Sequence, residues 1–539
     1  AANQDVPYII TMGIVMVVTA LLMMAGGIGG AYFAAKAAIS FAADIRKDTF
    51  EKVQKFSFAN LDQYNTGSLV TRLTNDVTQV QNLINMALRM MLRAPGMLIG
   101  ALIMAFMMNR QLAVIILIVI PLLLAAIILI LKTAFPRFGE MQRRLDRLNS
   151  GIQESLTNVR VVKSFVREAH EIEKFSRLNR DLKESSLRAL RIVITTMPVM
   201  MFAMNVTTLA VVWYGGNIII AGKMPVGDLT AFTTYIVQIL MSLMMLSMVF
   251  LQSSRASASM KRINEIFDTE IGLNDDNAEN KDKKVTEGRV EFKDVSFRYP
   301  GSDEDALEHI SFTARPGETT AIIGSTGCGK STLLNLIPRF YDVTEGSVTI
   351  DGVDVRDMTQ AQLHNELGYV PQKGVLFSGT ITSNLKFGGE QITDADMKKA
   401  AAIAQATEFI DAKPEGYDSP IAQGGSNVSG GQKQRLSIAR AIAKHPQIYL
   451  FDDSFSALDY KTDVALRRAL KAKTDNATVI IVAQRISTVL HANQILVLDE
   501  GRLVGKGTHA QLMESCPAYQ EIARSQLSQK ELSLQKEGE

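Results

Sequence analysis

The residues with the clearest chemical meaning in this sequence form a glycine-rich run that ends in Lys330 and Ser331. Its spacing, Gly-x4-Gly-Lys-Ser, is typical of a loop that binds the phosphates of a nucleotide. Glycines let backbone N–H groups turn inward around phosphate oxygens, at the positive end of the helix that follows. The lysine then reaches the outer phosphates, and the serine hydroxyl is a ligand of Mg²⁺. The expected nucleotide-binding residues here are Gly324, Ser325, Thr326, Gly327, Cys328, Gly329, Lys330, Ser331 and Thr332.

The segments around this run predict the strand, loop and helix that such a motif needs. Residues 319–323 are short, β-branched and apolar, as in a buried strand, and residues 332–337 begin a helical pattern. A second apolar strand, residues 448–451, ends in Asp452 and Asp453. Beside a phosphate loop, such a position suits Asp452 to hold Mg²⁺ and Asp453 to orient the attacking water. Without the phosphate loop, both would be interpreted as solvated carboxylates at a strand end.

A second glycine-rich segment, Val428-Ser429-Gly430-Gly431-Gln432, also leads into a helical pattern. Ser429 is a suitable cap for that helix, whose first turn would expose N–H groups to an anion. One small domain has little need of two cradles for a triphosphate. We therefore expect this segment to face a nucleotide that another copy or a partner chain holds.

Composition limits the classes of protein to which the chain can belong. Its 539 residues are too many for a single core, so two or more domains are expected. Lys and Arg number 57 against 55 Asp and Glu, and this near balance gives no sign of a nucleic-acid partner. The two cysteines, Cys328 and Cys516, argue against a disulfide framework and for a reducing compartment.

The first half of the chain contains apolar segments of membrane-spanning length, whose apolar residues go all the way round a helix. Their five ranges are 8–35, 86–108, 112–131, 192–221 and 229–251. The long connections, residues 36–85 and 132–191, are helical by pattern and rich in Lys and Arg. The positive-inside rule places them in the cytoplasm, as stalks that need a partner at their tips. The odd number of spans predicts one further span upstream of Ala1. Buried helices of a large soluble protein are the weaker alternative.

Methionine is frequent in the last two spans, where it could line a cavity for varied apolar ligands. Packing between helices or against lipid accounts for it equally well. The methionines concerned are Met197, Met200, Met201, Met204, Met241, Met244, Met245 and Met248.

A polar, charged segment without an apolar period marks a linker between the two halves. We expect a transmembrane domain over residues 1–268, the linker over 269–288, a soluble domain over 289–527 and a tail over 528–539. Within the soluble domain, residues 512–526 predict a single closing helix.

Together these motifs resemble an ATP-binding cassette (ABC) exporter, with one membrane domain fused to one nucleotide-binding domain. The likeness covers essentially the whole chain. It implies an all-α polytopic helical bundle with long intracellular helices, then an α/β P-loop NTPase domain, with ATP and Mg²⁺ as cofactors. Gly67-Ser-Leu-Val-Thr-Arg72-Leu-Thr-Asn-Asp76 and Val161-Val-Lys-Ser-Phe165 resemble the segments that flank the family's two intracellular turns. The resemblance therefore implies coupling helices near residues 57–66 and 163–170.

The resemblance also implies roles for single residues. Tyr299 matches the residue that stacks on adenine, and Gln372 matches the glutamine that contacts Mg²⁺ and the membrane domain. Residues 428–432 match the family signature, with Val428 in place of the usual Leu. The loop that contacts the other cassette of a dimer is matched by Ser456, Ala457, Leu458 and Asp459. The metal-binding set becomes Ser331, Gln372 and Asp452.

Two residues depart from the family pattern where hydrolysis would occur. The family's general base is Glu, and here it is Asp453, one methylene shorter. A misplacement of about 1 Å can slow a reaction roughly 10²-fold. The family's switch histidine is Gln484, which can donate a hydrogen bond to a phosphate but cannot carry a positive charge. Gln423-Gly424-Gly425 also stands where many members have Gly-Glu-Arg-Gly. The pattern resembles the degenerate half of a heterodimeric bacterial exporter.

The implied function is ATP-driven export of hydrophobic or amphipathic small molecules across the cytoplasmic membrane, with the nucleotide-binding domain in the cytoplasm. Asp453, Gln484 and Gln372 would be the catalytic residues of a weakly hydrolytic site. The signature would complete a competent site on a second half-transporter chain. A lipid or peptide exporter would share every motif, and an ATP-gated channel or regulatory protein of this fold could bind ATP for control alone. A soluble nucleotide switch is excluded if the apolar segments span a membrane.

Overall fold

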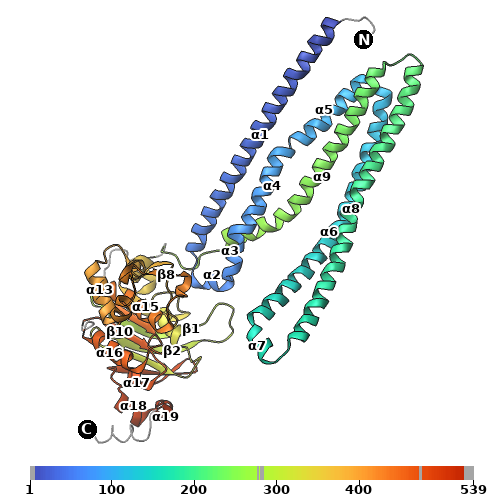
Figure 1. Cartoon of the computed structure of the whole chain (residues 1–539). Coiled ribbons are helices and arrows are strands. Elements are labelled where there is room, and N and C mark those ends of the chain that lie inside the picture. The colour runs from blue at the N-terminus through green and yellow to red at the C-terminus, as the bar shows by residue number, and fades with distance from the viewer. Residues whose placement is uncertain (1–5, 276–277, 279–284, 473–475, 527–539) are drawn as a thin grey trace. The chain divides into compact units, whose positions relative to one another are not determined.

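The computed structural model describes residues 6–275, 278, 285–472 and 476–526 (Figure 1). The chain divides into two compact units. Unit 1 comprises Ala1–Gln54 and Thr66–Thr269, and unit 2 comprises Lys55–Asn65 and Glu270–Glu539. Residues 55–65 therefore come from the N-terminal half of the sequence but pack with the C-terminal half.

Unit 1 is helical throughout its described part. Its elements are α1 (Val6–Gln54), α3 (Thr66–Thr71), the π-helical turn η1 (Arg72–Asp76), α4 (Val77–Met90), α5 (Arg93–Met108), α6 (Arg110–Thr157), α7 (Val159–Ser164), α8 (Glu168–Ile220) and α9 (Val226–Asp268). Five helical stretches among the described residues are long and apolar enough to cross a membrane. They lie in Val6–Gln54, Thr66–Met108, Arg110–Thr157, Met201–Ile220 and Val226–Leu246.

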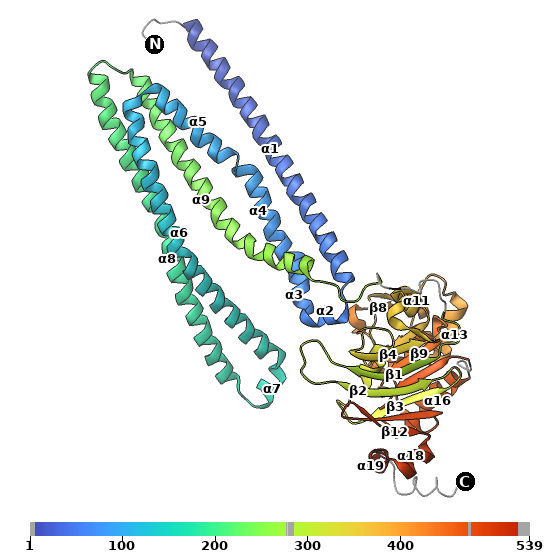
Figure 2. The same cartoon turned by 180° about the vertical axis from the view of Figure 1, so that it is seen from behind.

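The long helices of unit 1 pack side by side (Figure 2). Helix α6 runs along α8 and joins it through α7, while α4 and α5 pack on α9. The contact face of α9 carries Phe232, Ile236, Ile239 and Leu243, all buried and spaced three or four residues apart, as one stripe of a helix requires. Asp76, at the end of η1, accepts hydrogen bonds from Ser259 Oγ and Arg262 Nε at 2.8 Å and so ties α4 to α9.

The methionines of the last two spans are divided between exposed and partly buried positions. Met201, Met241 and Met248 are exposed, Met204, Met244 and Met245 are partly buried, and the side chains of Met197 and Met200 lie outside the described residues.

The described part of unit 2 contains three sheets. Its strands are β1 (Val290–Phe297), β2 (Leu307–Ala314), β3 (Thr319–Gly324), β4 (Glu345–Ile350), β5 (Val353–Asp354), β6 (Leu367–Val370), β7 (Gly379–Thr380), β8 (Pro420–Ile421), β9 (Ile448–Asp452), β10 (Thr478–Val482), β11 (Gln494–Asp499) and β12 (Arg502–Gly507). The main sheet has six strands in the order β12-β11-β3-β10-β9-β6, parallel except for β12. A four-stranded antiparallel sheet, β2-β1-β4-β5, and a β7-β8 pair complete the set.

Helices surround these sheets. They are α2 (Phe58–Gln63), α10 (Lys330–Leu336), α11 (Gln360–Asn365), α12 (Ile381–Leu385), α13 (Asp394–Ile403), α14 (Thr407–Asp411), α15 (Gly430–Ala443), α16 (Tyr460–Lys471), α17 (Ile486–Val489), α18 (His509–Ser515) and α19 (Pro517–Gln526). Short 3₁₀ turns lie at η2 (Val355–Asp357), η3 (Lys386–Gly388), η4 (Gly416–Asp418) and η5 (Gln423–Gly425).

The main sheet is buried on both faces, and its central strand shows how. Along β3, Ile322 points into the core shared with the four-stranded sheet and α10, while Ala321 and Ile323 point into the core beneath the other helices. An apolar run without polar alternation is what a parallel strand covered on both sides needs. The expected strand at 319–323, the helix after the phosphate loop and the strand before Asp452 are all confirmed.

The prediction of a single closing helix over residues 512–526 is wrong. Two helices, α18 and α19, meet at Cys516 and Pro517. Cys516 has φ −117° and ψ 103°, because a proline ring disfavours the helical conformation in the residue before it.

Candidate nucleotide-binding site

The glycine-rich loop joins β3 to α10, and its own fold demands glycine at several positions. A Cβ on Gly324 would lie 2.1 Å from the carbonyl oxygen of Leu498 on the neighbouring strand. Gly327 and Gly329 have φ angles of 86° and 95°, in the left-handed region that side chains disfavour. A Cβ on Gly329 would also lie 2.9 Å from the carbonyl oxygen of Ala306.

Lys330 begins α10, and its side chain is buried in the loop that precedes it. The Nζ atom donates hydrogen bonds to the carbonyl oxygens of Gly324 at 2.9 Å and Ser325 at 2.5 Å. It lies 3.7 Å from the buried Cys328 Sγ, so the thiol fills the space under the loop. A phosphate could take the place of these carbonyls as the partner of the ammonium group.

Ser331 and Asp452 form a pair of oxygen ligands at the carboxyl edge of the sheet. The Ser331 hydroxyl donates to Asp452 Oδ1 at 2.8 Å. Burial raises the pKa of the Asp452 carboxyl, and the neighbouring Asp453 adds to this, while the bond from Ser331 and the charge of Lys330 oppose it. No cluster of three or more His, Cys, Asp or Glu side chains among the described residues could hold a metal unaided. The pair fits Mg²⁺, which usually takes few protein ligands and completes its shell with phosphates and water.

Asp453 lies one residue beyond β9 and has a left-handed φ of 44°. Its N–H donates to the carbonyl oxygen of Val482, at the end of β10. The amide Nε2 of Gln484 donates to Asp453 Oδ2 at 2.9 Å, and Gln372 Nε2 lies 3.4 Å from the same oxygen. The structure thus brings together the three residues expected to be catalytic, with two neutral amides against one carboxylate oxygen.

A cavity of about 900 Å³ opens over the loop. Many residues that the sequence predicted for the site line this cavity: Tyr299, Thr326, Gly327, Gly329, Lys330, Ser331, Thr332, Gln372 and Gln484. The Tyr299 hydroxyl hydrogen-bonds the Thr332 hydroxyl at 2.9 Å, which fixes the aromatic ring beside the first turn of α10. An aromatic face and an ammonium group in one cavity suit a nucleotide whose base and phosphates they bind.

Acidic residues on the rim of this cavity were missed by the sequence analysis. They are Asp303, Glu304, Asp305, Glu308 and Glu500. The acidic run that begins four residues after Tyr299 could have signalled the first three, but Glu500 comes from the distant β11–β12 turn.

The signature segment is built differently from the phosphate loop. Ser429 caps α15, and its side chain and that of Gln432 bond each other's backbone N–H groups at 3.3 and 3.0 Å. A Cβ on Gly430 would meet nothing within 4 Å, and one on Gly431 only the Ala457 carbonyl oxygen at 3.4 Å. Neither glycine has a left-handed φ. Among the described residues, none of Val428, Ser429, Gly430, Gly431 and Gln432 lines the cavity.

The expected dimer-contact loop connects Asp453 to α16. The Ser456 hydroxyl donates to the Asp453 carbonyl oxygen at 2.8 Å. Asp459 caps α16 by accepting from the Thr462 N–H at 3.0 Å. Ala457 and Leu458 lie between these two anchors, so one end of the loop is hydrogen-bonded to Asp453 and the other to the start of α16.

Comparisons with known proteins cover nearly the whole chain. Residues 1–243 match the family model for an ABC transporter transmembrane region, and residues 307–456 match that for an ABC transporter. The uncharacterized ABC transporter ATP-binding protein YfiB of Bacillus subtilis (strain 168) is 41% identical over 97% of this chain and 91% of its own length. An ATP-dependent lipid A-core flippase of Syntrophus aciditrophicus (strain SB) is 32% identical over 90% of this chain and 80% of its own length. The solved structure of a bacterial Atm1-family ABC exporter with ATP bound superposes with a TM-score of 0.79 at 28% identity. It covers 92% of this chain and 86% of that chain.

Proposed function

This chain belongs to the ABC exporter family, and from that premise we propose that it is the half of a heterodimeric exporter whose own site hydrolyses ATP slowly. Exporters of this family couple ATP hydrolysis to transport and act as dimers in a membrane. The chain is accordingly a multi-pass membrane protein with a cytoplasmic ATPase domain that binds ATP.

The observation that carries the proposal is the arrangement around Asp453. Asp453 is buried and has a left-handed φ, and its carboxylate accepts a hydrogen bond from Gln484 Nε2 at 2.9 Å. A general base must reach the water whose proton it takes, and aspartate is one methylene shorter than the family's glutamate. Gln484 is neutral, so it cannot offer a developing phosphate charge the stabilisation that a protonated histidine would offer.

The residues expected to bind ATP and Mg²⁺ do not share the defects of Asp453 and Gln484. Tyr299 would stack on the base, Lys330 would pair with the outer phosphates, and Ser331, Asp452 and Gln372 would hold Mg²⁺. The metal would supply neutralisation of phosphate charge. We therefore expect ATP to bind at this site with ordinary affinity and to turn over slowly.

The signature supports a role toward a different chain. Its N–H groups begin α15 at an exposed position, and Gly430 has open space where a side chain would be. We infer that Ser429, Gly430 and Gly431 receive the phosphates of ATP held by a partner half-transporter, with residues 456–459 contacting that chain. A partner with a glutamate at the position of Asp453 would then have a fully equipped site.

Comparing ATP hydrolysis by single and paired chains tests this proposal. The full chain alone should hydrolyse ATP slowly, and co-expression with a glutamate-bearing half-transporter should raise turnover. Changing the partner's glutamate to glutamine should abolish turnover in the pair, whereas Asp453→Asn should change it little. Rapid hydrolysis by this chain alone, or an equal loss from both substitutions, would contradict the proposal.

For the substrate, we propose hydrophobic or amphipathic small molecules of the multidrug type. The exposed Met201, Met241 and Met248 of unit 1 offer soft, adaptable contacts for varied apolar molecules. A lipid is the second candidate, because two relatives 32% and 33% identical to this chain are lipid A-core flippases.

A transport assay separates the two candidates. Inverted vesicles that contain both chains should accumulate fluorescent lipophilic cations in an ATP-dependent manner if the multidrug proposal holds. Movement of a labelled lipid between leaflets, without accumulation of cations, would favour the second candidate. Vesicles with the partner's glutamate changed to glutamine provide the matched control.

A further inference from the structure

Tyr299 belongs to an aromatic cluster that extends away from the nucleotide cavity. Its ring meets the edge of Tyr341 with centroids 5.3 Å apart and planes at 82°. Phe297 contacts both rings, at 4.8 Å from Tyr299 and 5.6 Å from Tyr341. Edge-to-face aromatic pairs have preferred orientations, so a change in one ring alters the contact of the next.

Helix α2 lies at the far side of this cluster. The Tyr341 hydroxyl donates to Asp62 Oδ2 at 2.7 Å, and the ring of Phe58 lies 4.3 Å from that of Phe340. Asn60 Nδ2 adds a bond to the Glu270 carbonyl oxygen at 3.0 Å. Burial, and then the bond to Asp62, raises the pKa of Tyr341 well above its ordinary value, so the hydroxyl remains a donor at neutral pH.

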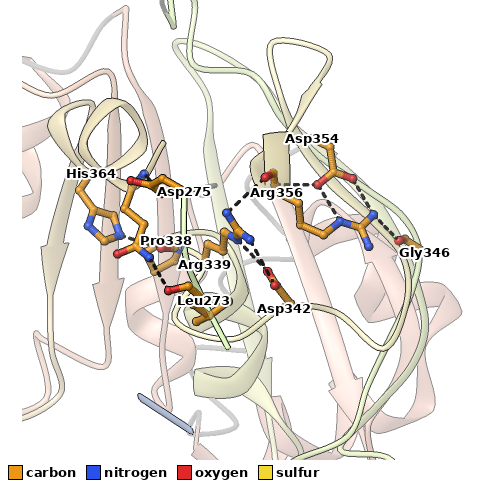
Figure 3. A network of polar contacts seen from close by, with 10 residues as sticks. Leu273, Asp275, Pro338, Arg339, Asp342, Gly346, Asp354, Arg356 and His364 are labelled. Atoms are coloured by element: carbon orange, nitrogen blue, oxygen red, sulfur yellow. Dashed lines mark hydrogen bonds and ion pairs between the residues drawn. The ribbon is translucent and has the colours of Figure 1, made fainter. Parts of the chain in front are cut away.

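The residues on either side of Phe340 and Tyr341 belong to a network of polar contacts, in which Arg339 meets Asp342 and Arg356 (Figure 3). Arg339, which precedes them, is buried and has a left-handed φ of 54°. Its guanidinium donates to Asp342 Oδ1 at 2.8 Å and to the Arg356 carbonyl oxygen at 3.2 Å. These bonds link Arg339 to Asp342 across the two aromatic residues and so restrain the backbone that carries their rings.

We propose that Tyr341 is a positioning residue through which α2 detects the nucleotide base at Tyr299. A base that stacks on Tyr299 adds a contact to the face of a ring that the Thr332 hydroxyl holds only at its tip, and the edge contact passes this added constraint to Tyr341. The hydroxyl of Tyr341 then holds Asp62, and α2 is continuous in sequence with α1 and α3 of unit 1. The inference rests on the proposed function, because it explains how a slowly hydrolysing site would still control the membrane domain.

This connection from Tyr299 to α2 differs from one through Gln372, which matches the glutamine that contacts Mg²⁺ and the membrane domain. The Gln372 amide lies 3.4 Å from Asp453 Oδ2, on the side where the terminal phosphate would be cleaved. The route through Tyr299 starts at the base. Base occupancy would therefore reach α2 whether or not the terminal phosphate is removed.

Amide hydrogen exchange in residues 55–65 tests the proposal in the full-length pair in lipid nanodiscs. The non-hydrolysable analogue AMP-PNP should slow exchange there, whereas inorganic tripolyphosphate, which lacks a base, should not. Tyr341→Phe keeps the ring and removes only the hydroxyl. It should weaken the AMP-PNP effect roughly threefold to tenfold, the factor expected for one such hydrogen bond. Its affinity for AMP-PNP should stay within about twofold of the unaltered chain, because the bond lost faces α2 and not the cavity.

Three further variants control the experiment. Tyr369→Phe removes a hydroxyl that donates to Asn335 Oδ1 at 3.1 Å, from a ring that also packs on Phe340, and should behave like the unaltered chain. Asp62→Asn keeps an acceptor oxygen and should retain the effect, whereas Asp62→Ala should lose it. Asp62 is exposed, so the alanine variant tests the proposal even if Tyr341→Phe folds poorly.

The proposal is overturned if Tyr341→Phe and Asp62→Ala keep full AMP-PNP protection, or if tripolyphosphate protects residues 55–65 as well as AMP-PNP does. Because AMP-PNP is not hydrolysed, the result does not depend on the rate of hydrolysis. Fast ATP turnover by the chain alone would contradict the slow site and leave this exchange result standing.

Discussion

Two glycine-rich segments of this chain lead into helices, one at Gly329 before α10 and one at Gly430 in the first turn of α15. Gly324 and Gly329 are locked in place by their own fold, with carbonyl oxygens 2.1 and 2.9 Å from where a Cβ would lie. Gly430 has ordinary backbone and nothing within 4 Å of that position. A side chain would therefore be accepted at the second segment and rejected at the first.

The difference separates two reasons for glycine. In the phosphate loop, the tight turn that forms the cradle already requires it, with or without a ligand. In the signature, folding does not require it, so the open space suits a ligand that approaches the backbone from outside the chain. The first segment also has a buried lysine and a carboxylate beside it. The second has only its reciprocal cap between Ser429 and Gln432.

The largest expected effect comes from Gly430→Ala in the pair of chains. A methyl group there would keep the partner's phosphates from the first N–H groups of α15, and loss of one such set of donors slows chemistry by about 10²–10³-fold. Thermal stability should stay within about 0.5 kcal/mol, as for a substitution in open space. ATP turnover and a thermal melt of the same preparation measure both.

Gly272→Ala is the matched control, because Gly272 also has open space and ordinary backbone in this structure. It should leave turnover and stability unchanged. If Gly430→Ala destabilises the protein as much as it slows turnover, the contrast between the two glycine runs fails.

The next largest effect concerns the slow ATP hydrolysis that we expect at the phosphate-loop site. Replacing Asp453 with Glu and Gln484 with His restores the family's general base and switch histidine, and should raise hydrolysis at this chain's own site by roughly 10–10²-fold. The measurement is ATP turnover by this chain when the partner's glutamate has been changed to glutamine. Asp453→Glu alone should give a smaller gain, since the neutral Gln484 would remain. No gain from the double variant would mean that other residues cause the slow hydrolysis.

Much of this site was predictable because its signals are local. The strand, the glycine spacing and the helix start all lie within 319–337, and the apolar run before Asp452 follows the same rule. Neighbouring parallel strands end at one edge of a sheet, so Asp452 could be placed near Ser331 without a structure.

Contacts between distant segments left no such signal. Asp62 and Tyr341 are separated by 279 positions, and nothing periodic in either segment predicts their hydrogen bond. The left-handed φ of Asp453 and the place of Glu500 on the cavity rim likewise depend on tertiary packing. The break at Pro517 did have a local signal, but the apolar period that continues across it obscured that signal.

A smaller effect is expected of Gly329→Ala, which reverses the pattern expected of Gly430→Ala by lowering stability. The added Cβ would meet Leu307 Cδ2 at 2.8 Å and would sit on backbone with φ of 95°. Forcing a side chain into this conformation costs about 1–3 kcal/mol. We expect the melting temperature of the nucleotide-free protein to fall by several degrees, as seen by differential scanning fluorimetry. A stable Gly329→Ala protein would show that the loop adapts more easily than its contacts suggest.

The smallest effect is a gain in stability at Asp452. Burial raises the pKa of this carboxyl in the folded protein, so the stability it contributes is present at low pH and is lost as pH rises through that pKa. At neutral pH the ionised group therefore destabilises the nucleotide-free fold. Asp452→Asn keeps an acceptor for the Ser331 hydroxyl and removes the charge. It should stabilise that state by about 0.5–1 kcal/mol, as when a functional charge is relieved, while Mg²⁺-dependent nucleotide binding is lost.

Melting curves from pH 4 to 8 measure this gain, which should shrink toward acid pH as Asp452 itself becomes protonated. Asp459→Asn is the control, because asparagine caps a helix as well as aspartate does and should bring no gain. Equal melting temperatures for Asp452→Asn and the unaltered chain at every pH would mean that the charge is fully compensated by Lys330 and Ser331. The charge beside the phosphate loop would then cost the fold no stability, and this difference from the signature segment would disappear.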